Sequence, residues 1–490
     1  MTSFRRAIDD EPALPPGPRM PPVVQTWYFM RRPFTLLERC VRRYGANFSV
    51  QLLGMDRGVI LSDPDAIRDL FTASDEDVVA GEFNAAFLEP ILGRHSLLML
   101  DGPRHLRERR LMLPPFHGER MPVYGRIMRE ITERVMAQWP LGRAFPILHE
   151  MQRITLEVIL RAVFGVDDDA QRDRLRSATL RFLALLDGPG AALIAVRAAQ
   201  IDLGRLSPWG RFLRLRRAVG GEILAAIAHR RAAGTAGRDD VLSMLIDARD
   251  ENGDAKSDEE LHDELFTLLM AGHETSATSL AWIFWCVLER PEVQAGIRAE
   301  LRRVAGSGAF DPRQANELTY LDAVIKETAR LHPITDGVGR LLKKPTRLGR
   351  LYLPAGAGAS PSTYLVHRHP DLWPEPEQFR PERFVGARPS PYTFFPFGGG
   401  VRRCLGAAFA TYEMKVVLAE VLSRAQLRVA PGYRPHVVRR AVTLAPSGGV
   451  PVVVAARSAD ARFERPEAEE AAHRHRATGA SLPSEMRWSA

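Results

Sequence analysis

A run of three glycines followed by a lone cysteine places the strongest local constraint on this chain. The stretch reads FGGGVRRCLG and spans residues 397–406. Glycine adopts backbone angles that are closed to other residues, so three in succession predict a tight loop. Residues 405–424 then show the apolar periodicity of an amphipathic helix. Cys404 is therefore expected at a helix N-terminus, where the helix dipole, loop N–H groups, Arg402 and Arg403 favour the thiolate.

Several roles are open to Cys404 on the sequence alone. A cysteine after a turn is most often a small buried filler. A nucleophilic cysteine needs a histidine base, and none lies nearby in the sequence. No second cysteine lies two or three residues away, which argues against zinc, iron–sulfur clusters and covalently attached haem. A single thiolate best suits an axial position on haem iron.

The glycine–cysteine stretch resembles the haem-binding signature of the cytochrome P450 superfamily. Five residues fall at the spacing of that pattern, namely Phe397, Gly400, Arg402, Cys404 and Gly406. The resemblance covers nearly the whole chain, from about residue 14 to about residue 455. It implies a mainly α fold with small β-sheets (α+β), built as a triangular helical prism. Haem b would lie between the oxygen-binding helix and the Cys-loop helix, with Cys404 as its axial ligand.

Composition and termini agree with one large domain. No linker or repeat divides the 490 residues, so residues 1–456 are expected to form a single haem domain. Residues 457–490 are polar and are expected to be a disordered tail. Three cysteines are too few for a disulfide framework, as in a reducing cytoplasm. The net charge of +8 is modest and includes no basic run with aromatics, which argues against nucleic-acid binding.

The N-terminal residues carry no targeting signal. Residues 1–11 are polar, and the apolar stretch 23–30 is far shorter than the roughly 20 residues that span a bilayer. The motif LPPGP at 14–18 resembles the hinge that follows the membrane anchor in eukaryotic family members, and no anchor precedes it here. We therefore expect a soluble, cytoplasmic, bacterial and monomeric protein without a transmembrane anchor.

Local patterns predict the elements of the N-terminal region. Residues 31–44 have a helical pattern, and residues 48–52 and 59–61 flank turn residues typical of a β-hairpin. Asp63 and Pro64 are a natural N-cap and first residue for a helix through Phe71. Residues 75–100 carry few helix signals, and the resemblance implies a variable loop over the substrate pocket. Its candidate pocket residues are Phe83, Phe87 and Leu88, for which ordinary loop packing is the alternative.

A long helix with an interior glycine is the second strong motif. A capping box at Ser257–Glu260 begins a helical pattern that runs to Arg290, with AGHETS at 271–276 in its middle. Gly272 costs about 1 kcal/mol relative to alanine there, which close approach of a cofactor and dioxygen would explain. The segment resembles the Ala-Gly-x-x-Thr element of the family. That resemblance implies that Ala271 and Gly272 contact haem and that Thr275 and Glu274 are catalytic; packing is the alternative for Thr275.

Other motifs provide candidate cofactor and structural contacts. His105 and Arg109 lie four residues apart and share a helix face, where the alternative is a solvated basic surface. The resemblance implies that His105, Arg109 and Arg340 contact the haem propionates and that Gly398 lies at the haem. It also implies a structural ion-pair network that holds the Cys loop, formed by Glu327, Arg330 and Arg383. Substrate contacts are further implied for Ile334, Val338 and Leu444, the last at a turn.

The resemblance implies a monooxygenase that inserts one oxygen atom from O2 into a lipophilic substrate, either a fatty acid or a terpenoid or steroid. No reductase domain is fused, so electrons are expected from NAD(P)H through a ferredoxin or flavodoxin and its reductase. An acidic partner of this kind would face a basic cluster of Arg107, Arg110, Arg403 and Lys415. Two other functions stay open: a haem-thiolate peroxygenase or isomerase, and a non-catalytic haem sensor or carrier.

Overall fold

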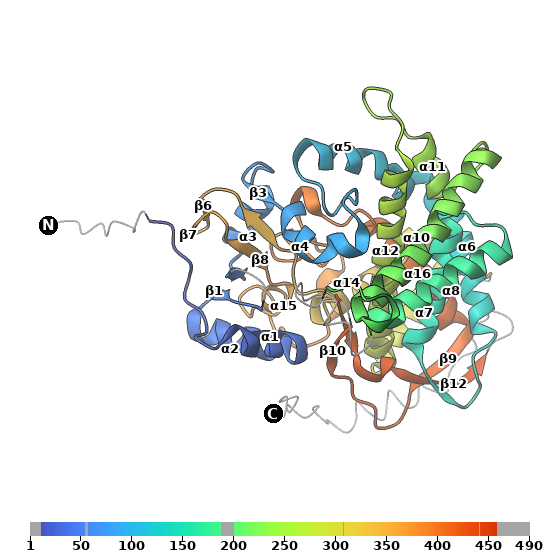
Figure 1. Ribbon diagram of the computed structural model, residues 1–490. Coiled ribbons are helices and arrows are strands. Elements are labelled where there is room, and N and C mark those ends of the chain that lie inside the picture. Colours follow the sequence, from blue (N-terminus) through green and yellow to red (C-terminus); the bar gives the residue numbers. More distant parts are fainter. Residues whose placement is uncertain (1–10, 54–56, 188–199, 307, 441, 458–490) are drawn as a thin grey trace, which may run out of the picture.

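The protein combines a large helical part with small β-sheets, as the computed structural model in Figure 1 shows. The structure describes residues 11–53, 57–187, 200–306, 308–440 and 442–457. Helices dominate one side of the molecule, whereas strands β1, β3 and β8 lie on the other (Figure 1). This arrangement confirms the predicted α+β fold class.

The helices occupy most of the described chain. In the first half they are α1 (Pro22–Arg31), α2 (Pro33–Tyr44), α3 (Pro64–Thr72), α4 (Gly81–Leu92), α5 (Gly102–Met112), α6 (Met121–Met136), α7 (Ile147–Val158), α8 (Asp169–Leu186), α10 (Pro208–Ala233) and α11 (Val241–Asp247). In the second half they are α12 (Asp258–Leu288), α13 (Pro291–Ala305), α14 (Thr319–Leu331), α15 (Thr363–Val366) and α16 (Ala407–Arg424). A π-helical turn, η3 (Ile159–Val163), continues α7 directly.

The strands form small sheets around this helical part. They are β1 (Asn47–Val50), β2 (Gly58–Leu61), β3 (Val78–Val79), β4 (Ala144–Pro146), β5 (Arg340–Leu342), β6 (Thr346–Leu348), β7 (Leu351–Leu353), β8 (Gly358–Pro361), β9 (Ala425–Val429), β10 (Val437–Arg440), β11 (Thr443–Pro446) and β12 (Pro451–Arg457). The largest sheet has the order β1-β2-β8-β5-β3. Its β1–β2 pair is antiparallel, which confirms the predicted hairpin, and β2 runs parallel to β8.

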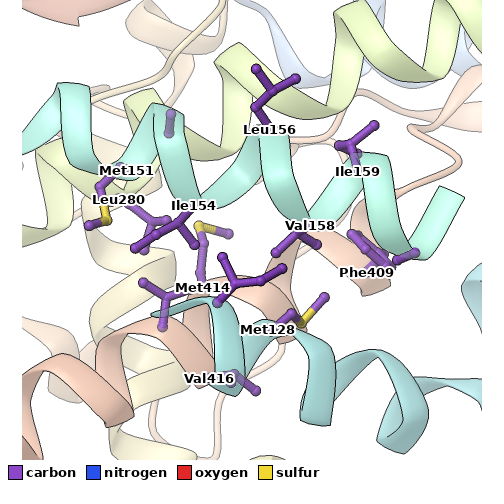
Figure 2. Packing of buried hydrophobic residues seen from close by; sticks show 14 of the residues in the cluster. Met128, Met151, Ile154, Leu156, Val158, Ile159, Leu280, Phe409, Met414 and Val416 are labelled. Atoms are coloured by element: carbon purple, nitrogen blue, oxygen red, sulfur yellow. The ribbon is translucent and has the colours of Figure 1, made fainter. Parts of the chain in front are cut away.

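The main hydrophobic core lies where α6, α7, α12 and α16 meet. Figure 2 shows side chains from these helices interdigitating, among them Met128, Ile154, Leu280 and Met414. Helix α12 is apolar on most of its circumference, which suits a helix at the centre of a domain. Its start is the predicted capping box, in which the Ser257 hydroxyl accepts from the Glu260 N–H and the Glu260 carboxylate accepts from the Ser257 N–H. The core therefore fixes α12 against both α7 and α16.

The prediction of a loop over residues 75–100 is wrong in its middle part, where Gly81–Leu92 form helix α4. The carboxylate of Asp101 accepts hydrogen bonds from the Ala80 and Gly81 N–H groups at 2.9 and 2.8 Å. A side chain about twenty residues downstream thus satisfies the N–H groups that a local cap normally binds. Patterns among neighbouring residues do not predict a cap from such a distant residue.

Two further boundaries differ from the sequence-based prediction. The apolar stretch 23–30 belongs to helix α1. One helix was predicted to begin at residue 31, but α1 ends there and a separate helix, α2, begins at Pro33. At the other end, Arg457 is the last residue of β12 and donates to the Ala137 carbonyl at 3.1 Å, so the domain extends one residue beyond the predicted limit. The predicted tail from 458 onward lies outside the described residues. Within the described ranges, no helix is both long and apolar enough to cross a bilayer.

Candidate active site

The glycine run shapes the Cys loop against helix α3. Gly398 and Gly400 have positive φ angles of 69° and 63°, which favour glycine. An added Cβ on Gly399 would lie 2.2 Å from the Phe71 ring, and one on Gly400 would lie 2.2 Å from the Phe71 carbonyl oxygen. The Cys404 N–H closes the loop by donating to the Phe397 carbonyl at 2.9 Å. Gly399 and Gly400 thus let the loop pack closely on Phe71 of α3, against its ring and its carbonyl group respectively.

The Cys404 side chain is exposed, yet the protein around it raises the pKa of its thiol above the ordinary value by desolvation. The Gly406 N–H, Arg109 and Arg403 favour the thiolate, as donors were expected to do, but desolvation outweighs them. A metal cation at the sulfur reverses the balance, since a coordinating thiol is deprotonated.

Helix α16 begins at Ala407, with Gly406 as its N-cap, so Cys404 precedes the helix by three residues. The predicted start at Leu405 is two residues early. Of the two guanidinium groups expected beside the cysteine, Arg403 acts on its thiol, whereas Arg109 takes the place expected for Arg402. Arg109, from α5, donates to the Arg403 carbonyl at 2.7 Å, whereas Arg402 turns away to form an ion pair with Asp101.

Four basic side chains predicted to contact the cofactor converge beside the loop, namely His105, Arg109, Arg340 and Arg402. His105 is buried, its Nδ1 has no hydrogen-bond partner, and burial together with the charges of Arg402 and Arg109 lowers its pKa to about 4. Burial lowers the pKa of Arg340 to about 10, and Arg402 adds to the effect. Asp101 and Asp75 are the acids that act on Arg340 and Arg402, and a cluster this basic in a partly buried region would be stabilised by further anionic groups. The two propionates of haem fit this requirement.

Helix α12 presents Thr275 and Ala271 on one face. The Thr275 hydroxyl donates to the Ala271 carbonyl at 2.6 Å, the back-bond expected for a threonine within a helix. Ala271 is exposed although the helix around it is mostly buried. The helix therefore leaves open space beside the residues that the sequence singled out.

Glu274 and Gly272 instead face helix α7 and its π-helical extension. Gln152 Nε2 donates to Glu274 Oε2 at 2.7 Å, and burial raises the pKa of the Glu274 carboxyl. A Cβ on Gly272 would lie 2.8 Å from Ile159 Cδ1, so packing against the π-helix explains this glycine without a cofactor. Sequence reasoning did not find Gln152, since its pairing with Glu274 depends on how α7 crosses α12.

The predicted ion-pair network is assembled in the structure. Arg330 is fully buried and holds the Glu327 carboxylate through Nε and Nη2 at 2.7 and 2.8 Å. Arg383 Nε reaches the same carboxylate at 3.2 Å. Arg330 Nη1 also donates to the His367 and Pro376 carbonyls, which ties α14 to the segment that leads into the Cys loop.

The candidate substrate residues on α4 divide into different environments. Phe87 is 42% exposed, which is unusual for a large aromatic residue and suits a ligand contact. Phe83 packs on the sheet, where a Cβ on Gly339 would lie 2.0 Å from its ring, and Leu88 packs against the main core. Packing therefore accounts for Phe83 and Leu88.

Of the other candidate substrate residues, Val338 lies near the Cys loop, and Leu444 is buried. A Cβ on Gly398 would lie 3.5 Å from Val338 Cγ2, and Val338 is 38% exposed. The Leu444 N–H donates to the Ile334 carbonyl at 2.8 Å, so these two residues are neighbours. Leu444 lies within strand β11, where Trp282 Nε1 donates to its carbonyl, and the prediction of a turn there is wrong.

The expected basic cluster for a redox partner is only partly available. Lys415 is buried and paired with Asp322 at 2.9 Å, so its prediction as a surface cation is wrong. Arg107 is paired with Asp250 at 3.2 Å. Arg403 remains exposed directly beside Cys404.

The fold and the cysteine loop define a haem-thiolate protein. The sequence matches the cytochrome P450 family over residues 15–450. A Mycobacterium tuberculosis protein designated cytochrome P450 135B1 is 41% identical over 432 residues, covering 87% of this chain and 89% of its own length. Another from that species, cytochrome P450 138, is 38% identical over 90% of this chain and 96% of its own.

The similar solved structures are also those of cytochromes P450. Cyanobacterial CYP120A1 with bound retinoic acid superposes with a TM-score of 0.81 at 25% identity, covering 92% of this chain and 100% of that one. The haem domain of cytochrome P450DA resembles this fold with a TM-score of 0.78, covering 93% of this chain and 99% of its own. This chain belongs to the cytochrome P450 family. It is a cytochrome P450 monooxygenase, and its cofactor is haem b.

Proposed function

We propose that the enzyme inserts one oxygen atom from O2 into a lipophilic organic substrate, using electrons from NAD(P)H delivered by separate redox proteins. The observation that carries this proposal is the Thr275–Ala271 hydrogen bond at an exposed point of α12. Glu274 precedes Thr275 and faces α7, where burial raises its pKa, so α12 carries a hydroxyl and an acid that could each take part in proton transfer.

Residues of the Cys loop and its surroundings would hold the cofactor. Cys404 would be the axial ligand, and Phe397, Gly398 and Gly406 would shape the pocket around its sulfur. His105, Arg109 and Arg340 would bind the propionates, because they are cationic or polar groups that meet in a buried region. Bound through thiolate, haem supplies the activation of dioxygen.

The residues of α12 would deliver and hold protons. Thr275 would present its hydroxyl oxygen as a hydrogen-bond acceptor at the oxygen-binding face, since its proton is donated to the Ala271 carbonyl. Glu274 would exchange protons on the α7 side, where burial raises its pKa toward the range in which it can both accept and release them. The Glu327–Arg330–Arg383 network would keep the Cys loop in place.

A lipophilic substrate is supported by two of the candidate substrate residues. Val338 and Phe87 are large apolar side chains that are exposed in the structure. The structurally similar CYP120A1 binds retinoic acid, a lipophilic molecule. For the redox partner, exposed Arg403 beside Cys404 supports an acidic surface such as that of a ferredoxin or flavodoxin.

The test is a reduced carbon monoxide spectrum followed by turnover with surrogate redox proteins. We expect the red-shifted absorption of haem-thiolate in the wild type and its loss in Cys404→Ser. With a bound substrate, product should depend on O2 and on NAD(P)H. Product formed with hydrogen peroxide alone would indicate a peroxygenase, and binding without any turnover would indicate a sensor or carrier.

A further inference from the structure

The carboxylate of Asp101 caps helix α4 from outside that helix. Its Oδ1 accepts hydrogen bonds from the Ala80 and Gly81 N–H groups at 2.9 and 2.8 Å, and its Oδ2 accepts from the Glu82 N–H at 3.1 Å. The first turn of a helix leaves such N–H groups without partners, and the helix dipole favours a negative charge beside them. Ala80, the N-cap residue, has no side chain that could bind them. Asp101 therefore holds the start of α4.

Glycine at position 81 lets this carboxylate come close to the backbone of α4. An added Cβ there would lie 2.6 Å from Asp101 Oδ2 and 2.3 Å from the Met99 carbonyl oxygen. A larger residue at the first position of the helix would therefore displace the carboxylate. The glycine and the acid together make the contact possible.

The same carboxylate also binds the Cys loop. Arg402 Nη2 donates to Asp101 Oδ1, the oxygen that accepts from the Ala80 and Gly81 N–H groups. The side chain of Arg402 is 9% exposed and that of Asp101 is 21% exposed, so little water reaches the ion pair. Charge-assisted hydrogen bonds are stronger than neutral ones, and removing one partner of a shielded pair is costly. The pair therefore fixes Asp101 as firmly as it fixes Arg402.

Two functional segments thus share one anion. Helix α4 carries Phe87, the exposed aromatic candidate for substrate contact, and Arg402 lies two residues before Cys404. The backbone of Asp101 is fixed as well, because it is the N-cap residue of α5 and its carbonyl accepts from the His105 N–H at 3.3 Å. A change at Arg402 can therefore reach the start of α4 through a single side chain.

We propose that Asp101 is a positioning residue that ties the substrate-side helix α4 to the Cys loop through Arg402. This role does not depend on which substrate the enzyme oxidises. The charge of Asp101 also acts on Arg340 and His105, two of the residues assigned to the propionates. Without that charge the surroundings of the haem are more positive, which favours the reduced haem because reduction adds a negative charge.

The first test is amide hydrogen exchange in the ferric holoenzyme, read on fragments that cover the start of α4. Arg402→Gln leaves the cap of α4 in place but removes the cation that holds Asp101. It should speed exchange of the Ala80, Gly81 and Glu82 amides about fivefold, as expected when a helix cap is weakened by about 1 kcal/mol. In an Asp101→Ala background, where these amides have already lost their acceptor, the same substitution should have no further effect.

Arg403→Gln is the matched control. It removes the neighbouring guanidinium, which is exposed and is not the partner of Asp101 in the ion pair. Exchange at the start of α4 should stay at the wild-type rate. Arg402→Lys keeps the charge and should give exchange between that of wild type and that of Arg402→Gln.

The second test is the midpoint reduction potential of the haem, which a purely structural cap would not change. Asp101→Asn keeps an acceptor for the α4 N–H groups but loses the charge. It should shift the potential to more positive values and speed exchange less than Asp101→Ala does, whereas Arg402→Gln should shift the potential to more negative values.

Unchanged exchange at the start of α4 in Arg402→Gln, or an unchanged potential in Asp101→Asn, would overturn the proposed role of Asp101. Neither measurement requires turnover or a bound substrate. Failure of the monooxygenase proposal would therefore leave both results standing, and failure of either test would leave that proposal unaffected.

Discussion

Gln152 on α7 donates a 2.7 Å hydrogen bond to Oε2 of Glu274 on α12, while the other oxygen of that carboxylate is buried. The hydrogen bond favours the ionised carboxylate, and burial favours the neutral acid. The two helices therefore set the proton affinity of Glu274 jointly.

Gln152→Leu should raise the pKa of Glu274 further, because it removes the donor that stabilises the carboxylate. The limb of the pH profile that depends on ionised Glu274 should then move to higher pH. The measurement is product formed per NAD(P)H consumed across pH, with Arg153→Gln on the exposed side of α7 as the control. An unchanged profile would show that Glu274 does not govern coupling.

Thr275→Ala should uncouple NAD(P)H consumption from product and increase hydrogen peroxide. The alanine cannot donate to the Ala271 carbonyl or accept a hydrogen bond at the oxygen-binding face. Thr275→Ser keeps the hydroxyl and should retain most of the coupling. Peroxide yield and product are measured together with surrogate redox proteins. If both variants couple like wild type, the assigned proton role is wrong.

The sequence predicted those parts of the protein that depend on neighbouring residues. The capping box of Ser257 and the β1–β2 hairpin follow from residues a few positions apart, and the structure confirms both. The Gln152–Glu274 bond joins residues 122 positions apart, and the Asp101 cap of α4 also acts from a distance. These pairs depend on helix crossings that no local spacing encodes.

Burial was the second effect that the sequence did not reveal. The pattern around Cys404 indicated donors that stabilise thiolate, yet desolvation in the folded loop outweighs them. Lys415 resembled a surface cation, but α16 is so enclosed that this lysine pairs with Asp322 in the interior. The magnitude of desolvation depends on how the rest of the protein packs around the group, which composition and hydrophobic periodicity do not determine.

Glu413→Gln should stabilise the protein at pH 8 and have little effect near pH 4.5. Burial raises the pKa of the Glu413 carboxyl from 4.5 to about 8. Between these values the folded state keeps a proton that the unfolded state has lost, so stability falls as pH rises, by at most about 1.4 kcal/mol per pH unit. Glutamine carries no titrating proton and removes this contribution. Unfolding temperatures at both pH values test it, with exposed Glu292→Gln as the control.

Glu327→Gln should destabilise the protein strongly and loosen the Cys loop. The substitution leaves Arg330 buried with an uncompensated charge, which costs about 3–5 kcal/mol when a buried pair is broken. We expect a lower unfolding temperature and partial loss of the thiolate absorption in the reduced carbon monoxide spectrum. Glu82→Gln breaks the exposed pair with Lys343 and should cost only about 0–1 kcal/mol. Similar effects of the two substitutions would contradict the structural role of the network.

Gly399→Ala and Gly400→Ala should both damage the Cys loop, and they should differ in whether Phe71→Ala rescues them. The added methyl group at Gly399 would meet the Phe71 ring, a side chain, whereas that at Gly400 would meet the Phe71 carbonyl oxygen. Removing the ring opens space only for the first. Gly400 also has a positive φ, so alanine is strained there whatever its neighbours.

The measurement is a double-mutant cycle on the unfolding free energy and on the fraction of thiolate-ligated haem. Phe71→Ala alone lowers stability, so the comparison is made within that background. Gly399→Ala should cost much less there than in wild type, and Gly400→Ala should cost the same in both. Equal rescue of the two glycine variants would mean that the loop moves as a unit away from α3. In that case backbone contact with Phe71 would not be what fixes the position of Cys404.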